Sequence, residues 1–143
     1  MIVYFDTSAV VPLLVAESGS AFCRRLWDDG DAVTTSQLTY VETAAALAQG
    51  ERMGRMKSNE HRAALRSLDR LWAEFDVIDV DHPLARRAAE LAGDFALRGY
   101  DAVHCASAEQ LEDNDLVAAS GDRKLLHAWR ELGLATADTC AGQ

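Results

Sequence analysis

Short β-branched runs alternate with longer helical patterns along the whole chain, and this alternation restricts the fold more than any other feature. The runs that read as strands are Ile2–Phe5, Ala32–Thr35, Val77–Val80, Leu116–Ala119 and, more weakly, Leu134–Thr136. Strands separated by helices need crossover connections, which make neighbouring strands parallel and cover both faces of the sheet. The sequence therefore predicts an α/β fold, a three-layer α/β/α sandwich around a mainly parallel sheet of about five strands.

The helical patterns are clearest in residues 58–75 and 83–98. In the first segment leucine, tryptophan and phenylalanine recur at helical spacing, and Ser58 is placed to cap the helix. In the second, Pro83 suits a first helical turn. A chain of 143 residues without a linker, a repeat or a low-complexity tract is expected to form a single domain over residues 1–143.

The amino-acid composition limits which class of protein this can be and in which cellular compartment we expect it. With 49% hydrophobic and 26% charged residues, the chain is expected to be globular. It has no apolar run of about 18 residues to span a bilayer, and no Lys or Arg precedes the apolar stretch at residues 9–16. Three cysteines without a CxxC pair indicate neither a disulfide framework nor a zinc site. We therefore expect a cytoplasmic protein in which Cys23 and Cys105 are buried.

The charge balance argues against a protein that coats nucleic acid. Fourteen Lys and Arg stand against 23 Asp and Glu, which gives a net charge of −9. Binding through bulk positive charge is thereby disfavoured. A protein that gathers carboxylates for metal chemistry remains possible.

Four acidic residues are predicted to meet at one edge of the sheet. Ligands of open parallel sheets bind at the carboxyl ends of the strands, near the point where the strand order reverses. Asp6 directly follows the first strand, and Asp122 follows the fourth in the sequence Ser120-Gly-Asp122. Glu42 and Asp101 lie on helices that are expected to approach the same edge.

Each of these acids also has a purely structural alternative. Asp6 can cap the helix that begins near Ala9, although Ser8 is the residue expected to act as that cap. Glu42 borders an apolar face marked by Leu38, Val41, Ala45 and Ala48, where a buried salt bridge would also satisfy it. Asp101 and Asp122 are both placed to cap helices. His104 shares a helix face with Asp101, as a metal ligand or as a packed, hydrogen-bonded neighbour.

A cluster of all four carboxylates would need a cation. Two like charges about 4 Å apart repel by on the order of 4 kcal/mol at an effective dielectric constant near 20. Hard oxygen ligands without His or Cys partners select Mg²⁺ or Mn²⁺. The reaction that uses such a site is metal-assisted attack of water on a phosphodiester.

The ordered motifs resemble those of PIN-domain proteins, and most nearly the VapC-type toxins of toxin–antitoxin pairs. The resemblance rests on Ile2-Val-Tyr-Phe-Asp-Thr-Ser-Ala-Val-Val11, Glu42, Asp101-Ala-Val-His-Cys-Ala106 and Ser120-Gly-Asp122. It implies a metal-dependent endoribonuclease in which Asp6, Glu42, Asp101 and Asp122 hold Mg²⁺ or Mn²⁺ directly or through water. Ser8 and Ser120 would support them. It also implies a cognate VapB-like antitoxin and a homodimer.

Positive charge is concentrated in residues 52–70. Arg62, Arg66 and Arg70 recur every four residues on the face opposite the apolar side of their helix. This stripe is either a solvated surface or a track for the RNA backbone that leads to the acids.

Other acid-dependent α/β enzymes fit less well. A haloacid-dehalogenase-like phosphatase needs a second Asp where Ser8 stands, and a receiver domain needs an early acidic pair where only Asp6 is present. Neither a P-loop nor a GxGxxG fingerprint occurs. The remaining alternative is a catalytically silent PIN-like module that binds RNA or protein.

Overall fold

The computed structural model describes residues 1–140 and contains one sheet of five parallel strands. The strand order is β3-β2-β1-β4-β5. The strands are β1 (Ile2–Phe5), β2 (Ala32–Ser36), β3 (Asp76–Ile78), β4 (Leu116–Ser120) and β5 (Ala135–Asp138). The predicted parallel sheet is confirmed. The two edge strands differ most from expectation: β3 ends before the exposed Val80, and β5 starts one residue later and continues to Asp138.

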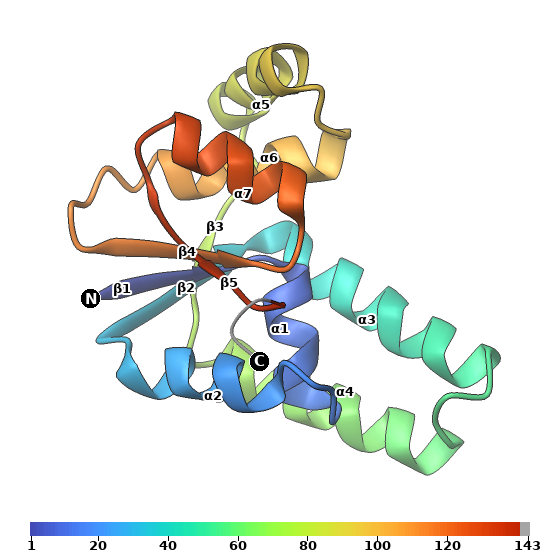
Figure 1. The fold of residues 1–143 in the computed structure, drawn as a ribbon. Helices are drawn as coiled ribbons and strands as arrows, with labels where there is room; N and C mark the ends of the chain where they lie inside the picture. The colour runs from blue at the N-terminus through green and yellow to red at the C-terminus, as the bar shows by residue number, and fades with distance from the viewer. Residues whose placement is uncertain (141–143) are drawn as a thin grey trace.

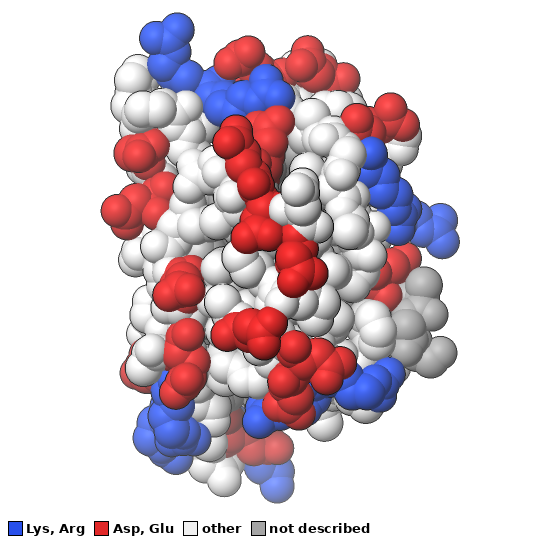
Figure 2. Space-filling view, turned by 90° about the vertical axis from the view of Figure 1, so that its left-hand side faces the viewer, with Lys and Arg blue, Asp and Glu red and all other residues white. Residues whose placement is uncertain are grey.

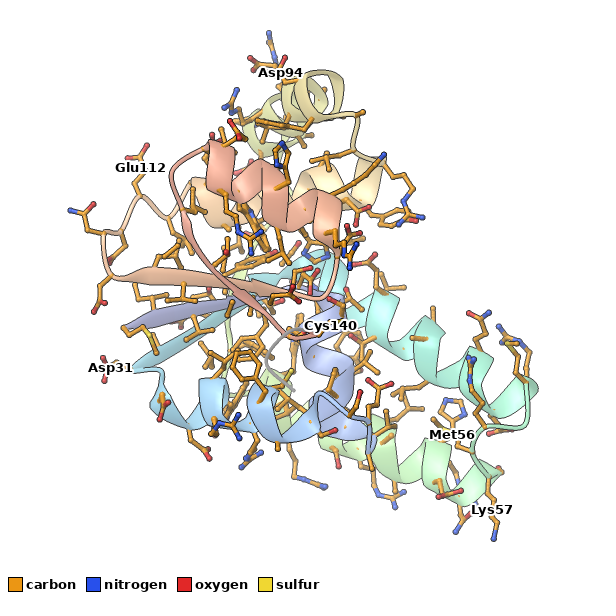
Figure 3. The ribbon with its side chains drawn as sticks, in the orientation of Figure 1. Asp31, Met56, Lys57, Asp94, Glu112 and Cys140 are labelled. Carbon is orange, nitrogen blue, oxygen red and sulfur yellow. The ribbon has the colours of Figure 1, made fainter. Side chains whose placement is uncertain are left out.

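Helices cover both faces of the sheet and complete the three predicted layers (Figure 1). One face carries α5 (His82–Phe95), α6 (Gly99–Glu109) and α7 (Arg123–Glu131), and the other carries α1 (Thr7–Leu14), α2 (Ser20–Asp29) and α4 (Ser58–Trp72). The helix α3 (Gln37–Arg52) runs antiparallel to α4, and the pair projects beyond the carboxyl ends of the strands. Met56 and Lys57 mark the far tip of this hairpin (Figure 3).

Alternation along the central strands divides the core in two. Tyr4 and Ala118 pack with the helices α5–α7, whereas Val3, Phe5 and Ala119 pack against the opposite layer. Both faces of β1 and β4 are therefore buried, as the short, nearly continuous apolar runs predicted.

Several helix boundaries and faces differ from expectation. Lys57, not Ser58, occupies the N-cap of α4, and the Ser58 hydroxyl instead accepts a hydrogen bond from Arg62. Helix α5 ends at Phe95 because Ala96 adopts a left-handed conformation with φ of 55°. Helix α2 was not predicted, since its sequence is polar and Cys23 is its one buried residue.

The buried face of α3 is also not the predicted one. Thr39, Thr43, Leu47 and Gly50 are buried, whereas Val41 is 59% exposed. Thr39 can occupy the core because its hydroxyl lies 2.8 Å from that of Thr35, which in turn lies 2.6 Å from the Phe5 carbonyl. The buried Thr43 hydroxyl has no hydrogen-bond partner within residues 1–140. Glu42 therefore lies one residue from Thr43, at the margin of a partly polar face.

The chain reverses its direction of travel across the sheet at β1. This strand pairs with β2 on one side and with β4 on the other. The crevice at the carboxyl ends of β1 and β4 is consequently the switch point at which ligands bind in open α/β sheets. None of the helices within residues 1–140 is long and apolar enough to cross a membrane.

Candidate active site

A cleft of about 590 Å³ lies at the predicted edge of the sheet. All four predicted acids line it: Asp6, Glu42, Asp101 and Asp122. The first follows β1 and the last follows β4, while Glu42 comes from α3 and Asp101 from the first turn of α6. Residues from four separate parts of the sequence are thus brought together by the crossover topology.

Asp6 is buried and held on both oxygens. It is the N-cap of α1, and its Oδ1 accepts the Ala9 amide at 3.0 Å and the Ser8 hydroxyl at 2.7 Å. Its Oδ2 accepts the Ser120 hydroxyl at 2.5 Å. Burial raises the pKa of Asp6 in spite of these hydrogen bonds and the nearby His104. Asp6 is therefore a cap and a cleft residue at once.

Ser8 and Ser120 tie the β1–α1 turn to the β4–α7 turn. Ser8 was expected to cap α1, but Asp6 is the cap. The Ser8 hydroxyl instead donates a hydrogen bond to Asp6 and accepts one from the Gly121 amide, 2.8 Å away. The Ser120 hydroxyl accepts the Asp122 amide at 2.9 Å. A side chain at Gly121 would be tight, because its Cβ would lie 3.0 Å from Thr139 Oγ1 and 3.1 Å from Cys140 Sγ. Cys140 also lines this end of the cleft (Figure 3).

Glu42 is fixed through one of its two oxygens. Its Oε1 accepts the Thr7 hydroxyl at 2.6 Å and His104 Nε2–H at 2.7 Å. Burial alone would raise the pKa of Glu42, but these hydrogen bonds outweigh it and lower the pKa. Within residues 1–140 no hydrogen bond reaches Oε2, which leaves this oxygen open.

Asp101 and Asp122 lie near one another, and both face the positively charged side chain of Arg98. Asp101 was expected to be the N-cap of α6, but Arg98 occupies that position. The Arg98 guanidinium lies 3.2 Å from Asp101 Oδ2 and 4.0 Å from Asp122 Oδ2. Burial, followed by the charge of Asp122, raises the pKa of Asp101 despite this arginine. Asp122 caps α7 as predicted, since its Oδ1 accepts the amides of Lys124 and Leu125.

The donor set fits a hydrated magnesium or manganese ion better than a tight cage. Within residues 1–140 no three His, Cys, Asp or Glu side chains form a ready-made metal cage. In the described part of the chain no hydrogen bond occupies Glu42 Oε2, Asp101 Oδ1 or Asp122 Oδ2, whereas both oxygens of Asp6 are engaged. Mg²⁺ commonly keeps several waters and binds one or two carboxylates directly. The open oxygens of the cleft acids suit such an ion, which would complete its shell with water.

The predicted basic stripe lies outside the cleft. Among the described residues, the cleft lining includes none from α4, which carries Arg62, Arg66 and Arg70. All three arginines are exposed, and Arg62 and Arg70 hydrogen-bond to serines of their own helix. The structure therefore brings the four acids and two serines together, but not these arginines.

The sequence did not single out several cleft residues, among them a fifth acid, Glu17, and two residues that contact the predicted acids directly. Thr7 stands between Asp6 and Ser8, and nothing in the pattern indicated that its hydroxyl reaches Glu42, 35 positions away. Arg98 precedes Asp101 by three residues, which is the spacing of a neighbouring ion pair on a helix. That spacing was a usable signal.

Comparisons with known proteins give the family. The sequence profile of the PIN domain matches residues 3–129. Ribonuclease VapC49 of Mycobacterium tuberculosis (strain ATCC 25618 / H37Rv) is 42% identical over 124 residues, which cover 87% of this chain and 86% of that protein.

Two solved structures share the fold at lower identity. Mycobacterium tuberculosis VapC20, described as a "Sarcin-Ricin loop cleaving toxin", superposes with a TM-score of 0.67 at 23% identity, covering 88% of this chain and 94% of that one. A toxin–antitoxin complex from Klebsiella pneumoniae gives a TM-score of 0.62 at 16% identity, covering 84% and 86%. Together with the profile match over residues 3–129, the topology and the strand-end acids, these likenesses show that the chain belongs to the PIN-domain family.

Proposed function

We propose that this protein is a metal-dependent endoribonuclease, the toxin of a toxin–antitoxin pair. The observation that carries the proposal is that four carboxylates from separate segments line one cleft at the switch point of the sheet. The 42% identity to a protein named as a ribonuclease supports the reaction class. The metal, Mg²⁺ or Mn²⁺, is inferred from the oxygen-only donor set.

Each residue has a role that follows from its contacts. Glu42, Asp101 and Asp122 each have an oxygen that no hydrogen bond within residues 1–140 occupies, so they would hold the ion, and Asp6 would support it through water. Ser8 and Ser120 orient Asp6 through the hydrogen bonds described above. When bound, the ion lowers the pKa of an attacking water and offsets the charge of the phosphodiester.

The partners are proposed from relatives of the same fold. A structural neighbour is described as a toxin–antitoxin complex, which supports an antitoxin partner for this chain. That the antitoxin is VapB-like and the toxin a homodimer is proposed from the family resemblance. Three free cysteines within residues 1–140 are in keeping with action in the cytoplasm, where thiols stay reduced.

A catalytically silent PIN-like binding module is the competing function. Such a module would share the fold and could retain a cleft. The presence of all four acids around one cleft favours the nuclease, because a site relieved of catalysis has no reason to keep buried carboxylates with raised pKa values.

The decisive experiment compares Asp6→Asn with Asp31→Asn. Purified variants are incubated with single-stranded and structured RNA in the presence of Mn²⁺ or EDTA. We expect Asp6→Asn to slow cleavage by at least about a hundredfold, comparable to the loss of one preorganised electrostatic contact. Asp31 is exposed at the opposite edge of the sheet, so its variant serves as the matched control. Metal-dependent cleavage that survives Asp6→Asn unchanged contradicts the assignment.

The arginine stripe on α4 is proposed as a track for the RNA backbone. Arg62→Glu combined with Arg66→Glu should weaken RNA binding about tenfold or more at low salt and flatten its salt dependence, because phosphate contacts release counterions. Manganese affinity should not change, since both side chains lie outside the cleft. Arg86→Glu, an exposed charge reversal on α5, is the control. RNA affinity equal to that of the control variant would assign the stripe to solvent.

A further inference from the structure

Three hydrogen-bonded side chains form a continuous series from the core between the sheet and helices α5–α7 to the cleft. The Tyr4 hydroxyl lies 2.8 Å from His104 Nδ1, and His104 Nε2 lies 2.7 Å from Glu42 Oε1. Tyr4 and His104 come from β1 and α6, 100 positions apart, and are 0% and 2% exposed. His104 and Glu42 both line the cleft, and Glu42 has an oxygen there, Oε2, that no hydrogen bond within residues 1–140 occupies.

The protons of this series can be placed from its partners. A carboxylate only accepts, so Nε2 carries the hydrogen that joins His104 to Glu42. The Tyr4 phenol is fully buried and is a hydrogen-bond donor in its ordinary, protonated form. In the neutral ring Nδ1 then accepts the Tyr4 hydroxyl, and this contact fixes which nitrogen faces Glu42.

Both nitrogens of His104 are therefore occupied, which excludes the ring as a metal ligand in this arrangement. A ligating imidazole must present a free lone pair to the ion. The interpretation of His104 as a packed, hydrogen-bonded neighbour fits its geometry. Its partner, however, is one of the acids that line the cleft.

We propose that His104 is a positioning residue for Glu42, and that Tyr4 in turn positions His104. Together with Thr7, the imidazole holds Oε1 of Glu42 on the protein side, so that Oε2 is the oxygen presented to the ion. This inference rests on the proposed metal-dependent function. Partners that orient a ligating carboxylate commonly change metal affinity by about 10- to 100-fold when they are removed.

The test measures Mn²⁺ affinity directly, by electron paramagnetic resonance of free Mn²⁺ during titration of the whole chain. His104→Leu removes the donor to Glu42 and should weaken Mn²⁺ binding by about 10- to 100-fold. His104→Gln retains an N–H donor of similar reach and should recover part of that loss. His127→Gln, an exposed histidine on α7, should bind as the wild type does.

Tyr4→Phe keeps the test decisive if His104→Leu does not fold. It retains the ring that packs edge-on against Trp129 and removes only the hydroxyl. We expect a smaller loss of Mn²⁺ affinity, about three- to tenfold, because the ring of His104 remains but is less well fixed. Melting temperature is recorded for every variant, since a purely structural role lowers it without changing the affinity.

The outcomes separate the two proposals. Wild-type affinity in folded His104→Leu, or in Tyr4→Phe where the leucine variant does not fold, overturns the positioning role and leaves the nuclease assignment intact. Failure of the wild type to bind Mn²⁺ at all overturns the metal-dependent function and, with it, the inference. Reduced affinity without rescue by His104→Gln also counts against the donor role, because the loss then follows packing and not the hydrogen bond.

Discussion

Carboxylates gather at both the amino and the carboxyl edge of the sheet, but they differ in burial and in their partners. At the amino edge they lie in exposed loops. Asp31 and Asp115 flank the Met1 amino group, and Figure 2 shows acidic side chains spread over this face of the molecule. Asp31 and Glu112 are labelled on that edge in Figure 3. At the carboxyl edge the acids line a cleft, and Asp6 is only 4% exposed.

The difference lies in what balances each charge. The Met1 amino group lowers the pKa of Asp31, so this acid is stabilised in its ionised form. Burial instead raises the pKa of Asp6 and Asp101, and Arg98 offsets the cost for Asp101 only in part. Asp6 and Asp101 would therefore gain from a bound cation, whereas Asp31 at the amino edge already has a positively charged partner. Counting charges along the sequence does not distinguish the two groups.

The largest expected difference between the two edges is in how a metal ion stabilises the fold: the stabilisation should depend on the acids at the carboxyl edge and not on those at the amino edge. Mn²⁺ at about 100 times its dissociation constant adds roughly 2.7 kcal/mol by mass action. For a chain of this size that raises the melting temperature by about 5–10 °C. We expect the shift in the wild type and in Asp31→Asn, and its loss in Asp6→Asn, as measured by calorimetry with and without EDTA.

Two outcomes would break the contrast. A wild type that Mn²⁺ does not stabilise would mean that the cleft acids are satisfied by their hydrogen bonds alone. A shift abolished by Asp31→Asn would place the ion at the amino edge.

A smaller effect concerns pH, and the two edges should respond with opposite signs. In the metal-free protein the raised pKa of Asp101 lets the folded state bind more protons than the unfolded one. Stability therefore falls as pH rises from the unfolded value near 3.8 through the folded pKa. Asp101→Asn removes this cost and should raise the melting temperature at pH 7 by about 1–3 °C.

Asp31 gives the opposite case. Its lowered pKa stabilises the fold above the unfolded value, and that contribution is lost as pH falls through the folded pKa. Asp31→Asn should thus lower the melting temperature slightly at pH 7 and have no effect near pH 2. Melting curves in EDTA from pH 2 to 8 measure both variants. Shifts of the same sign at pH 7 would contradict the contrast.

The sequence predicts the sheet well because its central strands are apolar runs that are too short to form a buried helix. It also places the acids correctly at the carboxyl edge, since strand ends and topology decide that. It does not predict the contacts that orient them. Thr7 and His104 reach Glu42 across 35 and 62 positions, and such pairings depend on how the helices settle against the sheet.

The face of α3 was missed for a related reason. Hydrophobicity alone favours Val41 over Thr39, but the hydroxyl of Thr39 finds a partner inside the core. A polar side chain can be buried once its hydrogen bond is met, and that partner is not visible in a one-dimensional pattern.

The hydrogen bond between Ser120 and Asp6 joins residues 114 positions apart. Asp6 is synthesised well before Ser120, Gly121 and the Thr139–Cys140 segment that lies close to the glycine. A nascent or truncated chain that ends before β4 therefore lacks the hydrogen bond to one of the two oxygens of Asp6. The cleft is complete only once these later segments have been made and have folded against β1.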